Sequence, residues 1–289
     1  MRIEDLKTQM EKTWCPGCFN SALLMAAKKA IVELVNNQRI KKENVVAVTG
    51  IGCHAKIYDY LNTNGFYGLH GRLIPTAVGI KIGNPDLTVI GFGGDGDTYA
   101  EGIAHFVHVC RYNPDITMIV HNNQVFALTT GQATPTTEKG YIGRSTPLGI
   151  KEKPLNPIAL ALISGASFVA RGSVLEVDHL TKLIQSAILH PGFAFIDVLQ
   201  PCITYHNTTD FFKKHCYKMK KTGYSFPEAL KKAQEWNYNL TNKAKTAIPI
   251  GIFYQEKRSI LEAQRPAKLP FYQVKRTPDW QKIIASFKT

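Results

Sequence analysis

The segment LTVIGFGGDGD, residues 87–97, is an apolar run that ends in a turn of glycines and aspartates. The run predicts a buried strand, and the apolar spacing of YAEGIAHFVHVCRY at 99–112 predicts a helix after it. Glycines there let the backbone approach a diphosphate, the helix N-terminus adds partial positive charge, and a carboxylate can hold a divalent cation. Alone, such a turn is more often only a tight connection.

The same alternation of strand and helix extends on both sides of this segment. Strand-type runs lie at 45–50, 116–122, 167–172 and 193–200, and helix-type runs at 20–35, 75–83, 156–166 and 177–189. This order predicts a doubly wound, mostly parallel α/β sheet. Beyond residue 206 the pattern weakens, so we expect one domain over 1–205 and a C-terminal extension over 206–289, packed on the domain or on a partner.

Three strand-type runs end in unusual loops: GIGCH at 50–54, GGDGD at 93–97 and NNQVF at 122–126. Ligands of such sheets bind outside the carboxyl ends of the strands, so these loops should converge. Asp95, Asn123 and a nearby backbone carbonyl could then supply oxygens to one Mg²⁺ ion that also binds phosphate. This pair resembles the GDG to NN signature of thiamine-diphosphate enzymes.

The cysteines offer a second set of ligands. WCPGC at 14–18 looks like a thioredoxin redox pair, but no strand precedes it and a helix follows it. Cys53 and Cys202 each follow an apolar strand, so they can converge with Cys15 and Cys18. Four thiolates suit zinc or a 4Fe-4S cluster, and the residues alone do not choose between them.

Composition narrows the class of protein. The 289 residues are 44% apolar, enough for an ordinary core. No apolar run reaches eighteen residues and the first fifteen lack a signal-peptide core, so we expect a cytoplasmic protein without membrane insertion. The net charge is +13, and residues 206–289 carry 17 basic against 6 acidic side chains, or +11. A basic surface favours an acidic partner.

Taken in order, the motifs WCPGC, GIGC, LHGRLIPTAVGIK, GDGD, VHNN and LTTGQ resemble the β subunit of the 2-oxoacid:ferredoxin oxidoreductases. The resemblance covers roughly the first 205 residues. It implies a sheet of the thiamine-diphosphate-binding type, one 4Fe-4S cluster on Cys15, Cys18, Cys53 and Cys202, and Mg²⁺ on Asp95, Asn123 and the carbonyl of Val125. Cys110 and Cys216 match no motif, and Cys110 reads as a core thiol.

The resemblance also implies a cofactor site. The residues expected around the diphosphate and thiazolium are Ile51, Gly52, Cys53, His54, His70, Gly96, Asp97, Ala127 and Leu128. His70 and Lys56 are candidate catalytic residues, although a solvated lysine is an equally good reading of Lys56. Phe126-Ala127 replaces the Tyr-Gly of many relatives, and His54 replaces a small residue, so both changes bear on substrate preference.

The implied reaction is oxidative decarboxylation of a 2-oxoacid to an acyl-coenzyme A, with electrons passing through the cluster to ferredoxin. The cofactor does the bond breaking, and the protein places it. The activating glutamate is expected on a partner, the α or fused γα subunit. Two alternatives stand beside this one: a non-oxidative thiamine enzyme, which has no use for four cysteines, and a basic zinc module for nucleic acid, for which no recognition motif appears.

Overall fold

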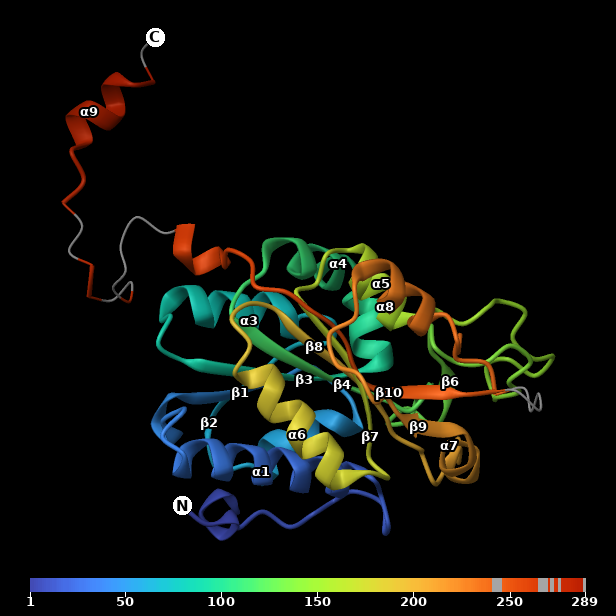
Figure 1. Cartoon of the computed structure of the whole chain (residues 1–289). Coiled ribbons are helices and arrows are strands. Elements are labelled where there is room, and N and C mark those ends of the chain that lie inside the picture. Colours follow the sequence, from blue (N-terminus) through green and yellow to red (C-terminus); the bar gives the residue numbers. More distant parts are fainter. Residues whose placement is uncertain (241–245, 265–269, 271–272, 275–276, 288–289) are drawn as a thin grey trace.

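A computed structural model describes residues 1–240, 246–264, 270, 273–274 and 277–287. Within these residues the fold is built on an eight-stranded sheet of order β2-β1-β3-β4-β8-β7-β10-β9 (Figure 1). All pairings in it are parallel except that of β10 with β7. In chain order the strands are β1 (Val45–Thr49), β2 (Asn64–Tyr67), β3 (Thr88–Gly94), β4 (Ile116–Asn122), β7 (Phe168–Ser173), β8 (Ala194–Leu199), β9 (Cys216–Lys218) and β10 (Ile248–Gln255).

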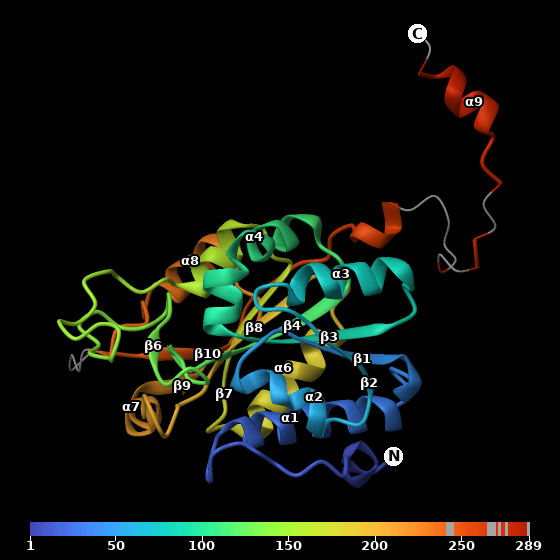
Figure 2. The ribbon, with the colours of Figure 1, turned by 180° about the vertical axis from the view of Figure 1, so that it is seen from behind.

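Helices cover both faces of the sheet. One face carries α1 (Asn20–Asn36) and α6 (Val177–Ile188), and the other carries α3 (Leu73–Gly83), α4 (Ile103–Tyr112), α5 (Pro157–Ile163) and α8 (Phe226–Ala233) (Figures 1 and 2). The predicted doubly wound, mostly parallel fold is therefore confirmed. The central strands read as continuous apolar runs because both of their faces are buried.

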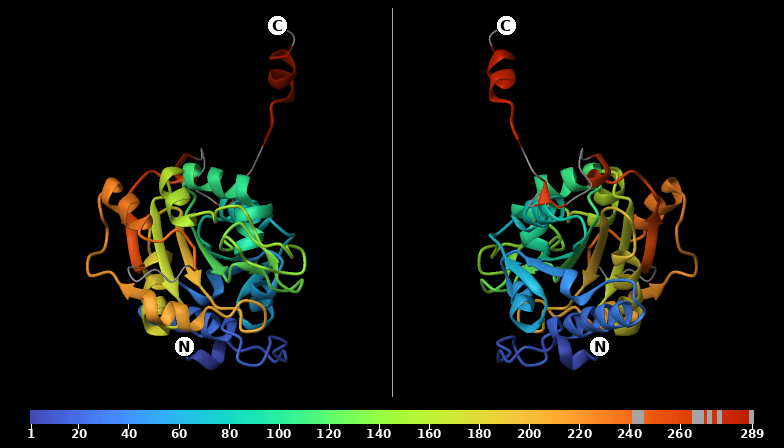
Figure 3. Two further views of the ribbon diagram at one scale, coloured as in Figure 1. Left: turned by 90° about the vertical axis from the view of Figure 1, so that its right-hand side faces the viewer. Right: turned by 90° about the vertical axis from the view of Figure 1, so that its left-hand side faces the viewer.

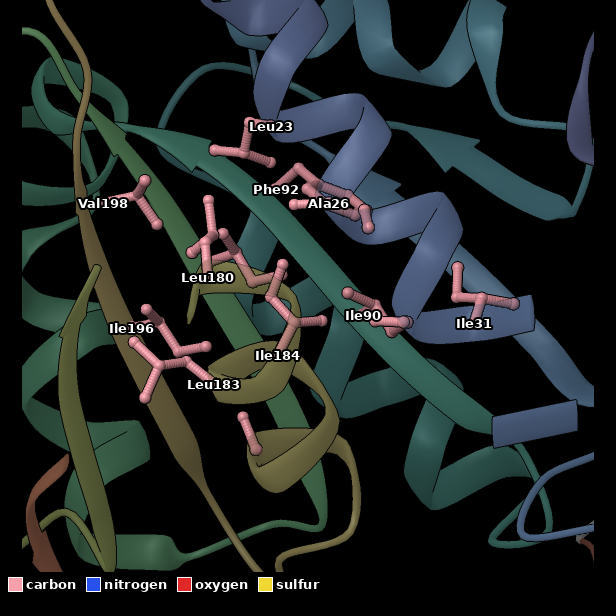
Figure 4. Packing of buried hydrophobic residues seen from close by; sticks show 14 of the residues in the cluster. Leu23, Ala26, Ile31, Ile90, Phe92, Leu180, Leu183, Ile184, Ile196 and Val198 are labelled. Carbon is pink, nitrogen blue, oxygen red and sulfur yellow. The ribbon is translucent and has the colours of Figure 1, made fainter. Parts of the chain in front are cut away.

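The core under α1 and α6 shows how the helices are held. Leu23, Ala26 and Ile31 of α1 belong to one buried cluster with Leu180 and Ile184 of α6 and with residues of the strands (Figure 4). Further labelled members of this cluster are Ile90, Phe92, Leu183, Ile196 and Val198. Each fully buried aliphatic side chain contributes about 1.5–3 kcal/mol relative to exposure, so this layer fixes the start of α1 against the sheet.

Shorter elements lie at both edges of the sheet. They include the 3₁₀ turns η1 (Ile3–Leu6), η2 (Lys42–Asn44) and η3 (Cys53–Lys56), the helix α2 (Ile57–Tyr60) and the two-stranded hairpin of β5 (Val125–Phe126) and β6 (Gln132–Ala133). The GGDGD segment runs from β3 directly into η4 (Asp97–Glu101), a π-helical turn. Such turns are rare and are frequent at functional sites.

The segment after residue 206, which we expected to be a C-terminal extension, contributes two strands to the main sheet. β10 pairs with β7, and β9 pairs with β10, so both extend the main sheet. The helix α7 (Thr209–His215) precedes β9, and α8 packs on β10 and α5. The 3₁₀ turn η5 (Leu261–Gln264) follows, and α9 (Trp280–Ala285) lies away from the body in both views of Figure 3. No helix among the described residues has the length and apolarity needed to cross a membrane.

A buried charged network joins this segment to the sheet. Arg171 of β7 and Asp197 of β8 are both fully buried. Tyr238 connects them, because its hydroxyl donates to Asp197 at 2.6 Å and accepts from Arg171 Nη2 at 3.1 Å. Arg171 also donates to the carbonyl of Pro249 in β10 at 3.2 Å. The arginine therefore ties β7, β10 and the loop after α8 together.

Arg171→Met should lower the free energy of unfolding by about 3 kcal/mol, because the buried Asp197 carboxylate would lose the buried cation that favours its charged form. That loss corresponds to roughly 6 °C or more in Tm for a domain of this size. Scanning calorimetry or a urea titration measures it. Arg111→Met, at an exposed position of α4, is the matched control and should change Tm little. An Arg171 variant as stable as the control would contradict the assigned role.

Candidate active site

The three loops predicted to converge do so around one cavity at the carboxyl edge of the sheet. The cavity has a volume of about 130 Å³. Its walls come from the loop after β1, the start of η4 and the turn after β4, which confirms the convergence. The lining includes Ile51, Gly52, Cys53, His54, His70, Gly94, Asp95, Gly96, Asp97, His121, Asn123, Val125, Phe126, Ala127, Leu128, Thr129 and Gln200.

Asp95 is a buried carboxylate whose nearest partners are two hydroxyl groups. It is 2% exposed, and its Oδ2 accepts from Thr134 Oγ1 at 2.6 Å and from Thr136 Oγ1 at 3.1 Å. Burial raises the pKa of Asp95 to about 7, against the effect of these two hydrogen bonds. No ion pair of Asp95 with a cationic side chain is found among the described residues. A bound divalent cation would restore its charged form.

The carboxylate of Asp97, two residues after Asp95, is held by hydrogen-bond donors of the protein itself. Its Oδ1 accepts from the backbone N–H of Gly71 at 2.8 Å and of Ile51 at 3.2 Å, and it contacts His70 Nδ1 at 2.7 Å. Its Oδ2 lies 3.6 Å from His54 Nε2. Burial acts to raise the pKa of Asp97, but His54, the Gly71 N–H and His70 outweigh it and lower the pKa to about 2. Asp97 therefore anchors the two histidines.

Glycines make this packing possible. A Cβ on Gly50 would overlap the Asp97 carboxylate, and a Cβ on Gly96 would overlap the Phe126 ring. Gly52 has φ of +148°, a conformation that side chains disfavour. The glycines of both motifs are thus required by close approach of neighbouring atoms and by backbone conformation.

The turn after β4 presents backbone and amide oxygens to the cavity. Asn123 Oδ1 accepts from the Val125 N–H at 3.1 Å, and Gln124 between them has φ of +60°. Gln124 is held by its own side chain, which donates to the carbonyls of Thr136 and Tyr238. Leu128, on the hairpin that follows, leaves 48% of its surface exposed at the mouth of the cavity.

The four cysteines of the second motif set surround a neighbouring cavity of about 240 Å³. Burial raises the pKa of the Cys53 thiol to about 11, and the proximity of Cys18 and Cys202 adds to the rise. Burial likewise raises the pKa of Cys18, with smaller contributions from Cys15 and Cys202. The other three sulfurs are therefore close enough to Cys53 to affect its ionisation. As they stand, no group of three or more Cys, His, Asp or Glu side chains in the described part of the chain forms a ready metal site.

The N-terminal cysteine loop is fastened onto the loop that carries Cys53. Trp14 Nε1 donates to the carbonyl of Cys53 at 2.7 Å, and the Trp14 ring packs edge-on against Tyr60 at 4.7 Å. Lys56 Nζ donates to Thr13 Oγ1 at 2.9 Å and to the Thr13 carbonyl at 3.2 Å. Lys56, a candidate catalytic residue, thus lies beside the cysteine cavity with its ammonium group on Thr13.

The two unmatched cysteines lie elsewhere. Cys110 is fully buried in α4 and belongs to the apolar core under α3 and α5, which confirms that it is a core thiol. Cys216 begins β9, where burial raises its pKa to about 12. Neither residue lines the cysteine cavity.

The two cavities share a wall formed by Cys53, Asn123, Ala127, Leu128 and Gln200. Sequence reasoning missed several residues around it. Thr134 and Thr136 hold Asp95, and Asn20, His121 and Gln200 form a buried polar group inside the wall. His121 stood within the VHNN motif, but no spacing or residue pattern pointed to the others.

Comparisons with known proteins agree with this arrangement. A family model described as "Thiamine pyrophosphate enzyme, C-terminal TPP binding domain" matches residues 50–198, and a model of the C-terminal part of the pyruvate ferredoxin oxidoreductase beta subunit matches 202–268. The chain is 40% identical to 2-oxoacid:ferredoxin oxidoreductase 1, subunit beta, of Aeropyrum pernix, over 97% of this chain and 90% of that protein. It is 44% identical to a 2-oxoacid:ferredoxin oxidoreductase subunit beta of a Sulfolobus species, over 91% and 90%.

A solved structure is similar over the whole chain. This is 2-oxoglutarate:ferredoxin oxidoreductase from Magnetococcus marinus, with 2-oxoglutarate, coenzyme A and succinyl-CoA bound. The TM-score is 0.88 at 29% identity, and the match covers 100% of this chain and 97% of that one.

Proposed function

This chain belongs to the 2-oxoacid:ferredoxin oxidoreductase β subunits, and we propose that with its partner subunit it converts a 2-oxoacid and coenzyme A to an acyl-coenzyme A and CO₂. The electrons pass through a cluster on this chain to ferredoxin. The observation that carries the proposal is the shared wall between the loop cavity and the cysteine cavity. A non-oxidative thiamine enzyme has no use for the second cavity.

The loop cavity fits a metal-bound diphosphate. Asp95 offers a buried carboxylate that accepts from two threonine hydroxyls, and Asn123 and the Val125 carbonyl lie on the adjacent strand end. We assign Mg²⁺ to these three residues. Thiamine diphosphate supplies the carbanion chemistry when bound, and Ile51, Gly52, Cys53, His54, His70, Gly96, Asp97, Ala127 and Leu128 shape its site.

Within this site we propose different roles for Asp97 and His70. The Asp97 carboxylate, held by two backbone N–H groups, orients His70 through Nδ1, which leaves the other ring nitrogen for the cavity. His70 is about one third exposed, at 38% for its side chain. We propose that His70 hydrogen-bonds the reacting groups and that Asp97 acts through it and contacts no phosphate, since two anions would repel.

The cysteine cavity fits a 4Fe-4S cluster on Cys15, Cys18, Cys53 and Cys202. Its donor set is all sulfur: Cys15 is exposed, Cys18, Cys53 and Cys202 are partly buried, and Lys56 lies beside them. Tetrahedral zinc would take the same ligands, but the reaction of this family transfers electrons and zinc has no redox chemistry. Because Cys53 lines both cavities, it keeps the cluster next to the cofactor.

The activating glutamate is assigned to the partner, the α or fused γα subunit, so the active site is completed at a subunit interface. The experiment is to copurify the complex anaerobically, identify its chains and assay a panel of 2-oxoacids with coenzyme A and ferredoxin or a viologen. Acceptor reduction that requires both a 2-oxoacid and coenzyme A is expected. A colourless complex that decarboxylates without reducing the acceptor would refute the proposal.

The basic segment after residue 206 is a candidate ferredoxin surface. Ferredoxins are typically acidic, and exposed lysines of this segment follow the loop of Cys202. Neutralising four of them should lower the second-order rate with ferredoxin about tenfold at low salt, because steering is screened over roughly 10 Å at 0.1 M. The four are Lys213, Lys214, Lys220 and Lys221.

Two controls separate steering from other effects. A small neutral acceptor should be reduced at the unchanged rate, and replacing Arg39 and Lys41, before β1 at the opposite edge of the sheet, should leave the ferredoxin rate unchanged. Dissociation of the complex in the fourfold variant would make the segment an assembly element instead. An unchanged rate with an intact complex would leave these lysines as a solvated surface.

A further inference from the structure

Asn20, the first residue of α1, is buried beside a cluster cysteine. It is 1% exposed, and its Nδ2 donates to Cys18 Sγ at 3.4 Å. The backbone N–H of Asn20 also donates to this sulfur. One residue thus directs two N–H groups at one sulfur, and both favour negative charge on that sulfur.

The other end of the Asn20 amide is fixed by two donors. Asn20 Oδ1 lies 2.8 Å from His121 Nδ1 and accepts from Gln200 Nε2 at 3.1 Å. His121 Nδ1 also faces Gln200 Oε1 at 3.0 Å, and because both of these oxygens are acceptors, this ring nitrogen carries the proton. With the oxygen held on that side, the amide nitrogen of Asn20 can only point to Cys18.

This polar group crosses the wall between the cavities. Asn20 lines the cysteine cavity, His121 lines the cofactor cavity, and Gln200 lines both. The hydrogen bonds therefore form a continuous path from the cofactor side to the sulfur of Cys18.

Hydrogen bonds to the sulfur ligands of an iron–sulfur cluster stabilise its reduced, more negative state. We propose that Asn20 is a positioning residue that raises the reduction potential of the cluster bound at Cys18, with its amide oriented by His121 and Gln200. This inference rests on the proposed function, since it requires the cluster. A higher reduction potential of the cluster favours electron transfer from the cofactor, so the polar group in the wall between the cavities would promote that transfer.

The test is a redox titration of the anaerobic complex, followed by electron paramagnetic resonance of the cluster signal that Cys53→Ser removes. Asn20→Leu keeps the side-chain volume and removes both amide ends. It should disfavour one-electron reduction about tenfold, a fall of about 59 mV in potential. Asn36→Leu is the matched control, at the far end of the same helix about 24 Å away, where the Asn36 side chain is exposed and bonds the N-terminal residue Met1. It should leave the potential unchanged.

A second variant keeps the inference testable if Asn20→Leu loses its iron. Gln200→Leu leaves Asn20 in place but removes one of the two donors that orient it, so the potential should fall by a smaller amount. Potentials of both variants within error of wild type would overturn the inference while leaving the proposed function intact. A wild-type complex without any 4Fe-4S signal would instead overturn the proposed function itself.

Discussion

Asp95→Ala should bind thiamine diphosphate at least about 100-fold more weakly than the wild-type complex, a loss of ~2.7 kcal/mol. The reason is that Asp95 is the one acidic side chain assigned to Mg²⁺, and its two threonine partners cannot replace the charge. Cofactor affinity is measured by titrating the depleted complex with thiamine diphosphate at fixed Mg²⁺. Iron content should be unchanged, because Asp95 does not line the cysteine cavity.

The matched control is Asp86→Ala. Asp86 is an exposed carboxylate in the loop before the same strand, β3, at the opposite end of the sheet. Its replacement should leave cofactor affinity as it is. An Asp95 variant that binds the cofactor with wild-type affinity would remove Asp95 from the metal site and with it the assignment of the loop cavity.

Cys53→Ser should lose most of the iron and all reduction of ferredoxin, because Cys53 is the cysteine shared by both cavities. Serine is a hard oxygen donor and replaces a cluster thiolate poorly. Cys15→Ser, Cys18→Ser and Cys202→Ser should lose iron as well. Iron analysis and visible absorption of anaerobically purified complex measure the effect.

Two cysteines of the same chain serve as controls. Cys110→Ser and Cys216→Ser should keep iron, since one lies in the apolar core and the other in β9. Cys110→Ser should cost some stability because it buries a hydroxyl in an apolar site. Wild-type iron content in Cys202→Ser would exclude that residue from the ligand set.

The sheet and its loops could be predicted because burial on both faces leaves a clear sequence signal. The strands around residue 90 are continuous apolar runs, and each is followed by a helix with apolar spacing. β2 gave no such signal, because its four residues are all exposed at the sheet edge. β10 was missed although it is apolar, since Pro249 and Gly251 weaken the expectation of a strand that only tertiary pairing with β7 restores.

The parts of the candidate site that belong to sequence motifs could be predicted, and their partners could not. Asp95, Asn123, Cys53 and Cys202 follow strand ends, and parallel topology brings strand ends together, whereas Cys15 and Cys18 precede α1. The partners of these residues come from distant segments with ordinary composition. Thr134 and Thr136 reach Asp95 only through the β5–β6 hairpin, and Asn20 meets Gln200 only after α1 has packed on the sheet. Such contacts depend on tertiary packing, which local sequence patterns do not predict.

The central claim is that cofactor and cluster occupy adjoining cavities of this chain and exchange electrons across their common wall. Electron paramagnetic resonance of the anaerobic complex, frozen after mixing with an active 2-oxoacid in the absence of ferredoxin, tests it most directly. The account predicts a reduced-cluster signal that is absent in both Cys53→Ser and Asp95→Ala. A wild-type complex that contains iron and thiamine diphosphate and releases CO₂, yet leaves its cluster oxidised, would contradict it.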